Sequence, residues 1–302
     1  MMNTENIIKL LEVKFAETGV DVTVSLSSIT KNNDIVREGV TIRSNIKGVN
    51  VSPNIYFDAF KTLKSDEAIA DAIVHTYCNS MLNAPVSPVI GDDIYDKLKT
   101  AKIKGALINT EGNYERLHKL AHKDFLDLSI IFKLVLQEDD YNGSRAVITV
   151  TNEILDFLGK TEDDLFAEAC ANEESPIVMS MMEMLMGMGR GIPLDMLTED
   201  IIESMMTMPM FVVTNKAKFD GAFSMLDKVT LNKLAEKFDN DVYIIPSSIH
   251  EYIAIPAGTI EIGDLKDMIY EVNKNEVAPE EVLSYNVYYY NKKTKDLTIA
   301  IS

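Results

Sequence analysis

The sequence predicts an α+β protein in which helices pack on antiparallel β-hairpins, and three observations indicate this class. Apolar residues alternate with polar ones over Val20–Leu26, which is the pattern of a half-buried strand. Apolar residues recur instead at helical spacing between Ile7 and Phe15. Two β-branched runs, Val242–Ile245 and Tyr252–Ile255, flank a short polar segment and predict a hairpin.

Helices and strands are expected to alternate through the first part of the chain. The first helix begins after Asn3 or Thr4, which are good N-terminal caps, and ends at Gly19. Thr161 and Asp164 have the spacing of a capping box, which predicts a helix start within an αα-hairpin. The other expected elements are strands over 36–46, 103–108, 126–135 and 146–150, helices over 65–82, 92–99 and 114–122, and the αα-hairpin over 151–171.

A change in composition separates this part from the C-terminal part. Residues 177–210 hold eleven of the sixteen methionines and are expected to be helical. The predicted organisation is an N-terminal α+β region over 1–172, a methionine-rich helical segment over 173–210 and a C-terminal α+β region over 211–302, unless these form one continuous domain. The last region is expected to contain a strand over 211–215, helices over 230–238 and 264–272, and hairpins around 246–251 and over 287–301.

The methionine-rich segment has two interpretations. Methionine is unbranched and polarisable, so it fills irregular gaps in a core and also suits surfaces that accept several partners. The first use predicts a buried, adaptable helix, which is the favoured interpretation because methionine stripes are usually core. The second predicts a groove for a partner or ligand, for which the binding candidates are Met181, Met184, Met188 and Arg190.

The charge of the chain disfavours several functions. With 29 basic and 47 acidic side chains, the net charge is −18, which repels phosphate backbones and disfavours direct nucleic-acid binding. No apolar run reaches the roughly 18 residues needed to span a bilayer. Cys78 and Cys170 fit no metal or redox spacing, and the first residues lack the pattern of a secretory signal. We therefore expect a cytoplasmic protein without a cofactor.

The polar turn between the two C-terminal strands holds the densest group of reactive side chains. Ser247 or Ser248 could act as a nucleophile with His250 as its base, and Glu251 would then orient the imidazole. The glycines of a strained nucleophile turn are absent from the sequence, however, and side chains this close in a hairpin rarely converge. The favoured interpretation is structural, with the serines turning the chain and His250 bonding to backbone.

A second set of candidate residues has the spacing of metal ligands. His118 and His122 lie four residues apart, so they would share one face of the helix predicted over 114–122. Asp124 or Asp127 could supply a carboxylate. The glutamate that a metalloprotease needs beside the first histidine is replaced by lysine in this sequence, so a structural role is favoured over metal binding.

Several short motifs recur together in one known group of proteins. The most specific is Pro246–Glu251, which reads Pro-Ser-Ser-Ile-His-Glu. The others are Ser52–Tyr56, Leu107–Asn109 with Asn113, Asp127–Leu128, Val213–Lys216 with Gly221–Ala222, Tyr243–Ile245, Val272–Asn273 and Val277–Ser284. The chain resembles, over nearly its whole length, an uncharacterised bacterial family, a domain of unknown function. The resemblance implies a single cytosolic architecture but no activity and no catalytic residue.

Taken together, these features favour a non-enzymatic intracellular interaction protein with a protein partner. Strong acidity, an adaptable methionine-rich segment and the lack of catalytic spacing in the sequence all favour binding over catalysis. One alternative is a hydrolase that uses Ser247 or Ser248 with His250. Another is an acidic decoy that occupies a nucleic-acid-binding protein, which requires carboxylates gathered on one face.

Overall fold

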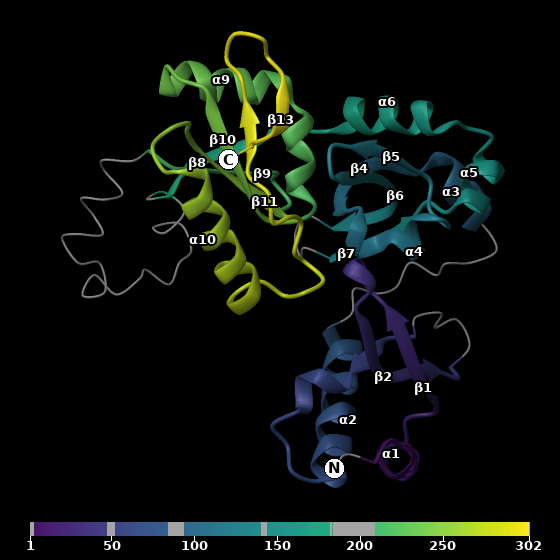
Figure 1. The fold of residues 1–302 in the computed structure, drawn as a ribbon. Helices are drawn as coiled ribbons and strands as arrows, with labels where there is room; N and C mark the ends of the chain where they lie inside the picture. The colour runs from purple at the N-terminus through teal and green to yellow at the C-terminus, as the bar shows by residue number, and fades with distance from the viewer. Residues whose placement is uncertain are drawn as a thin grey trace. The chain divides into compact units, whose positions relative to one another are not determined.

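The computed structural model of the chain describes residues 3–46, 52–83, 94–139, 144–181, 183 and 209–301. The chain forms two compact units (Figure 1). Unit 1 consists of Met1–Lys31 and Ile35–Lys97, and unit 2 consists of Asn32–Asp34 and Leu98–Ser302. We describe each unit by itself.

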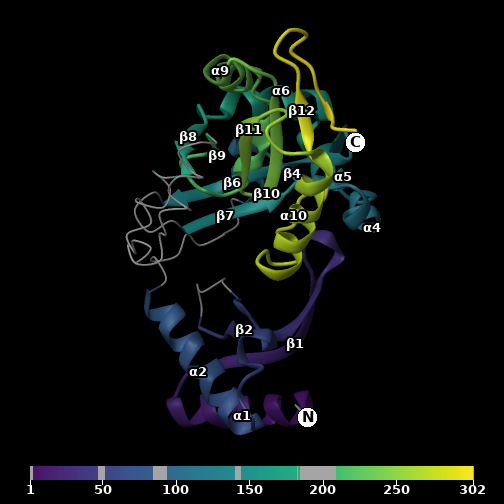
Figure 2. The ribbon, with the colours of Figure 1, turned by 60° about the vertical axis from the view of Figure 1, so that its left-hand side comes forward.

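Unit 1 is a small antiparallel sheet with two helices packed on it (Figure 2). Its sheet has the order β1-β2-β3, and the register places Val24 opposite Ile42 and Leu26 opposite Val40. The elements are α1 (Thr4–Thr18), β1 (Val22–Thr30), β2 (Val36–Ser44), β3 (Asn54–Tyr56), the 3-10 helix η2 (Phe57–Phe60) and α2 (Asp66–Asn83). The core gathers apolar side chains from both helices and from β2.

The ends of α1 follow the local chemistry that the sequence predicts. The Asn3 side chain accepts a hydrogen bond from the backbone N–H of Asn6, and Gly19 ends the helix in the left-handed conformation with a φ of 71°. Asp66, at the start of α2, accepts hydrogen bonds from the backbone of Asn3 and from the side chain of Asn6. The two helices are therefore joined at their N-terminal ends as well as through the core.

Unit 2 contains two further antiparallel sheets and the helices that cover them. The four-stranded sheet has the order β4-β6-β5, with β7 also paired to β6, and the six-stranded sheet has the order β13-β12-β10-β11-β9-β8. The elements are η1 (Asn32–Asp34), the end of α3 (Ile94–Thr100, of which the residues up to Lys97 belong to unit 1), β4 (Lys102–Asn109), η3 (Glu111–Asn113), α4 (Tyr114–Leu117), β5 (His122–Phe125), β6 (Leu128–Asp139), β7 (Ser144–Thr149), α5 (Asn152–Leu158), α6 (Glu162–Asn172), β8 (Ile177–Ser180), β9 (Phe211–Thr214), η5 (Gly221–Leu226), α9 (Lys228–Phe238), β10 (Val242–Ser248), β11 (Glu251–Pro256), α10 (Ile262–Asn275), β12 (Tyr288–Tyr290) and β13 (Leu297–Ile299).

The hairpin of β10 and β11 lies at the centre of the six-stranded sheet. Tyr243 and Ile255, which face each other across the hairpin, belong to a buried cluster with Leu265 and Ile269 of α10. Side chains alternate along a strand, so Val242 and Ile244 point to the opposite face, where they are fully buried. Both faces of this hairpin are therefore covered by packed side chains.

Most of the predicted elements are present, and the fold class is confirmed. The capping box of Thr161 and Asp164 is formed in both directions. The predicted helix over 114–122 is wrong, because α4 ends at Leu117 and β5 begins at His122. The chain leaves the helix to pair with a distant segment, since the Ala121 N–H donates to the carbonyl of Val150.

The methionine-rich segment differs from the expected helix where the structure describes it. Residues 177–180 form strand β8, which pairs with β9 and completes the six-stranded sheet. Residue 182 and residues 184–208 lie outside the described residues, so a helix there stays a prediction. The two compact units divide at Lys97 and Leu98, within α3, and the division predicted over 173–210 also stays a prediction.

Candidate functional site

His250 occupies the turn between β10 and β11, and its imidazole is held from two sides. The ring Nδ1 accepts a hydrogen bond of 3.1 Å from the backbone N–H of Asp220, so the proton of the neutral ring lies on Nε2. Nε2 faces Oε1 of Glu281 at 3.6 Å, which is longer than a hydrogen bond. The ring of Phe219 lies 5.2 Å away, and the histidine side chain is only 22% exposed.

The backbone of this turn is fixed as firmly as the ring. The Thr214 hydroxyl donates to the carbonyl of His250 at 2.8 Å, and the Ile249 N–H donates to the carbonyl of Glu281 at 2.9 Å. Gly221 packs directly against the turn, because a Cβ there would lie 2.4 Å from the His250 carbonyl oxygen. Glycine is therefore required at this position for close backbone approach.

The predicted nucleophiles are engaged elsewhere. Ser248 Oγ accepts from the His250 backbone N–H at 3.0 Å, and Ser247 Oγ donates to the Glu251 carbonyl at 3.3 Å. Within the described residues, no hydrogen bond joins either hydroxyl to the imidazole. A serine nucleophile must donate its proton to a free ring nitrogen. Here Nδ1 is occupied by a backbone donor and Nε2 carries the proton, so the residues lie in one turn without forming a catalytic triad.

Buried charges lie next to the turn. Lys133 Nζ and Asp220 Oδ2 are 2.5 Å apart, with side chains 14% and 10% exposed. Lys104, opposite Lys133 across β4 and β6, lies 3.8 Å from Glu173. Burial raises the pKa of the Glu173 carboxyl, and Lys104 only partly offsets this effect. Burying a charged pair costs desolvation energy, so these ion pairs are weak evidence of added stability.

A second polar network surrounds Asp127, a residue that motif spacing assigned no definite role. Its carboxylate accepts from the hydroxyl of Tyr288 at 2.6 Å, the hydroxyl of Ser284 at 2.9 Å and the side-chain amide of Asn286 at 3.0 Å. Burial, followed by the adjacent Asp127 charge, raises the pKa of Tyr288. The Asn273 amide donates to the Ser284 carbonyl at 3.0 Å and supports the same segment.

Residues that carry the family resemblance therefore pair with one another. Asp127, Asn273 and Ser284 all belong to those motifs, and so does Asn109, whose side chain donates to the Leu283 carbonyl at 3.1 Å. The resemblance was the only sequence signal for this network, because the partners are far apart in the chain. These hydrogen bonds hold the segment before β12 in place. They occupy polar groups that would otherwise be free to bind a ligand.

The remaining predicted candidates are dispersed. His118 follows the end of α4 with its ring 4.8 Å from that of Tyr114, and His122 Nδ1 lies 2.9 Å from the Leu120 carbonyl oxygen. Asp124 lies on β5, and the described residues contain no group of three metal-ligating side chains around it. The shared helical face expected for the two histidines is wrong, because a strand begins at the second one.

The binding candidates in the methionine-rich segment can be placed only in part. Met181 follows β8, and its N–H donates to the carbonyl of Met210 at 3.0 Å. Met184, Met188 and Arg190 lie outside the described residues. A groove formed by these side chains therefore stays a prediction.

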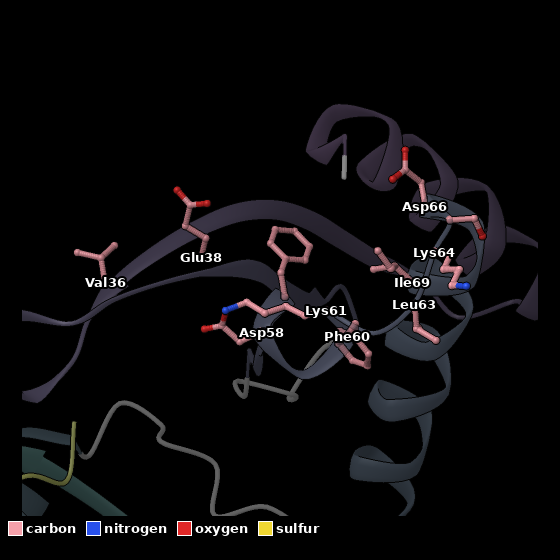
Figure 3. A pocket seen from close by; sticks show the side chains of 11 residues that line it. Val36, Glu38, Asp58, Phe60, Lys61, Leu63, Lys64, Asp66 and Ile69 are labelled. Carbon is pink, nitrogen blue, oxygen red and sulfur yellow. The ribbon is translucent and has the colours of Figure 1, made fainter. Parts of the chain in front are cut away.

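A concave site lies in unit 1, where the sequence motifs indicated none. It is a groove of about 700 Å³ between β2, η2 and the start of α2 (Figure 3). Buried Phe57 and Ile69 contribute to its lining, whereas Val36 and Leu63 are 56% and 38% exposed. The lining residues are Val36, Glu38, Phe57, Asp58, Phe60, Lys61, Leu63, Lys64, Ser65, Asp66 and Ile69. We call this site the unit 1 groove.

The charges of the unit 1 groove fall into two groups. Asp58 is paired with Lys61 at 2.5 Å and with Arg37, and these hydrogen bonds, that of Lys61 first, lower the pKa of its carboxyl. Glu38 and Lys64 have no ion-pair partner in the part of the chain that the structure describes. Figure 3 shows these two side chains well separated, with Phe60 and Lys61 between them in the view. The groove thus offers apolar surface and two free charges of opposite sign.

Fold and site together define an antiparallel α+β protein with a concave site of mixed apolar and charged lining, in which the serine and histidine side chains of the β10–β11 turn do not form a catalytic triad. The chain belongs to a family of unknown function, DUF5688, whose family model matches residues 4–292. This confirms the resemblance to a domain of unknown function. Comparison with curated proteins and comparison with solved structures each found no match. Among the described residues, no helix is both long enough and apolar enough to cross a bilayer.

Proposed function

We propose that this protein is a non-enzymatic interaction module, and that the unit 1 groove binds an extended segment of a partner protein. The observation that carries the proposal is the exposure of Val36 and Leu63 at a concave site whose neighbouring apolar side chains are already buried. Pockets of this size are typical of specific binding sites. Covering the two exposed side chains removes apolar surface from water, which favours association.

The free charges specify the chemistry of the partner segment. Glu38, on β2, would pair with a basic residue of the partner, and Lys64, in the loop before α2, would pair with an acidic one. Such rim charges contribute orientation and association rate more than affinity. The segment that fits the groove therefore has apolar residues at its centre, a basic residue at one end and an acidic residue at the other.

The geometry of the other candidate site supports binding over hydrolysis. The His250 imidazole accepts from a backbone N–H, and Ser247 and Ser248 are used to shape the turn. Serine hydrolysis requires a hydroxyl aligned with a free ring nitrogen, and these atoms do not meet that requirement. These residues are accounted for by the fold of unit 2.

The test is a selection from a display library of random short peptides on the immobilised full-length chain. The expected result is enrichment of peptides with the charge and apolar pattern described above. Binding should fall at least tenfold for the double variant V36S/L63S and remain unchanged for V13S/L126S. The control is matched, because Val13 is also 56% exposed and Leu126 is 44% exposed, and neither lines the groove.

Two outcomes would contradict the proposal. One is a selection that yields no peptide bound above background by the folded chain. The other is peptide binding that falls equally in both double variants, because this would place the site elsewhere. Circular dichroism of each variant shows that the fold is retained before binding is compared.

A further inference from the structure

Strand β1 forms one edge of the unit 1 sheet and is nine residues long. An edge strand presents unpaired backbone N–H and C=O groups, which are a template for another strand. Proteins normally protect such edges by keeping them short or by placing charged residues or proline in them. β1 has the sequence Val-Thr-Val-Ser-Leu-Ser-Ser-Ile-Thr, with neither a charge nor a proline.

The other outer strands of the described sheets are protected. β3 and β13 have three residues each and β8 has four. The outer strands of the four-stranded sheet carry charges: two lysines in β4, Lys123 and Asp124 in β5, and Arg145 in β7. Among the described strands, β1 is the one outer strand that is both long and uncharged.

From this contrast we infer that β1 pairs with β1 of a second copy of this chain, antiparallel about a twofold axis. Charge is the reason for choosing a second copy as the occupant. Each chain carries a net charge of −18, so most faces repel the same face of another copy. The uncharged β1 edge is a place where two copies meet without opposing like charges. The inference concerns self-association and does not rest on the function proposed for the unit 1 groove.

The side chains of β1 specify the register of this pairing. Leu26 is the middle residue of the strand and is 50% exposed. An antiparallel pair centred on it places Leu26 opposite Leu26 of the second copy, within side-chain contact. The same register places Val24 opposite Ser28 and Thr23 opposite Ile29, so every opposed pair is uncharged. The twofold contact therefore buries the most exposed apolar side chain of the strand.

A single nine-residue strand is about 30 Å long, so the interface is small and the dimer should dissociate at low concentration. Screening by added salt weakens the repulsion between two anionic chains. We expect sedimentation of the full-length chain to show a monomer–dimer equilibrium whose dissociation constant falls severalfold as salt is raised. A surface held together by ion pairs would respond in the opposite direction.

Charge substitution at Leu26 provides the decisive test. L26K and L26E should each be monomeric at concentrations where the natural chain is dimeric, because two like charges then face each other across the axis. An equimolar mixture of the two variants should recover a dimer of one copy of each. The control is I46K, which also adds a charge at an exposed apolar position, 59% exposed, outside β1; it should leave the dimer intact.

The inference is overturned if the natural chain stays monomeric at all concentrations and salt levels used. It is also overturned if L26K dimerises as the natural chain does, or if the L26K and L26E mixture fails to associate. Failure here is distinguishable from failure of the groove proposal, because V36S/L63S changes the groove and meets β1 only opposite its last residue, Thr30, far from Leu26 in the register. Circular dichroism of L26K and L26E separates loss of pairing from loss of fold.

Discussion

The two units use their polar residues in different ways. In unit 2, the chemically conspicuous side chains are occupied by intramolecular partners, as His250 is by the Asp220 backbone and Asp127 is by three donors. In unit 1, ordinary residues such as Leu26 and Val36 leave apolar surface exposed beside an open strand edge and a groove. The comparison teaches that a reactive residue type can have a purely structural role, and that exposed apolar side chains beside an unpaired strand edge or a groove are the better place to test for binding.

The largest effect should follow from breaking the Asp127 network. D127A leaves the donors of Tyr288, Ser284 and Asn286 without their acceptor in a largely buried place. We expect a loss of about 3 kcal/mol or more in the free energy of unfolding, since each unsatisfied buried group costs about 1–3 kcal/mol. Urea denaturation of the full-length chain measures it.

The matched control for this substitution is D124A, which removes an exposed carboxylate on the neighbouring strand β5. It should change stability by less than about 0.5 kcal/mol, as surface substitutions usually do. If D127A behaved like D124A, the network would have no structural role, and Asp127 would have to be considered for ligand binding.

An intermediate effect should follow from filling the space beside the His250 turn. G221A places a Cβ 2.4 Å from the His250 carbonyl oxygen, so the backbone of one segment must move. The expected cost is about 1–3 kcal/mol of unfolding free energy, as for other overpacking changes. G263A is the comparison, because nothing lies within 4 Å of its added Cβ and the site is helical. Stability loss of the same size in G263A would show that the close approach at Gly221 is not the cause.

The smallest effect concerns pH and Glu173. Burial raises the pKa of this carboxyl in the folded chain, so its ionised form costs stability above the folded pKa, and the cost disappears below the ordinary value of 4.5. E173Q should therefore stabilise the chain at neutral pH, and the gain should shrink as pH falls through the folded pKa. E236Q, at an exposed position of α9 whose charge does not act on Glu173, should show no such trend. A gain that is independent of pH, or a loss at neutral pH, would contradict this account of Glu173.

Features set by local chemistry were predictable from the sequence. The capping of α1 by Asn3, its termination at Gly19 and the capping box at Thr161 each depend on residues a few positions apart. The β10–β11 hairpin was predictable for the same reason, because two β-branched runs flank a short polar turn. The spacing of His118 and His122 was misleading because pairing of Ala121 with Val150 decides the local structure.

The candidate sites were much less predictable, because they are assembled from distant segments. Asp127 and Tyr288 are separated by 161 positions, and no local pattern relates them. The unit 1 groove combines a strand, a 3-10 helix and a helix start, and none of its residues forms a recognisable motif. The Pro246–Glu251 motif was located correctly as a turn, but its reactive residue types gave no information about which atoms were already hydrogen-bonded.

The central claim is that unit 1 binds while the His250 turn of unit 2 maintains the fold. Hydrogen exchange of the full-length chain, with and without a peptide enriched in the display selection, tests it most directly. The account predicts added protection over residues 36–38 and 57–69 and unchanged exchange over residues 246–251. Protection centred on residues 246–251, with the groove unchanged, would contradict it and place binding at the His250 turn.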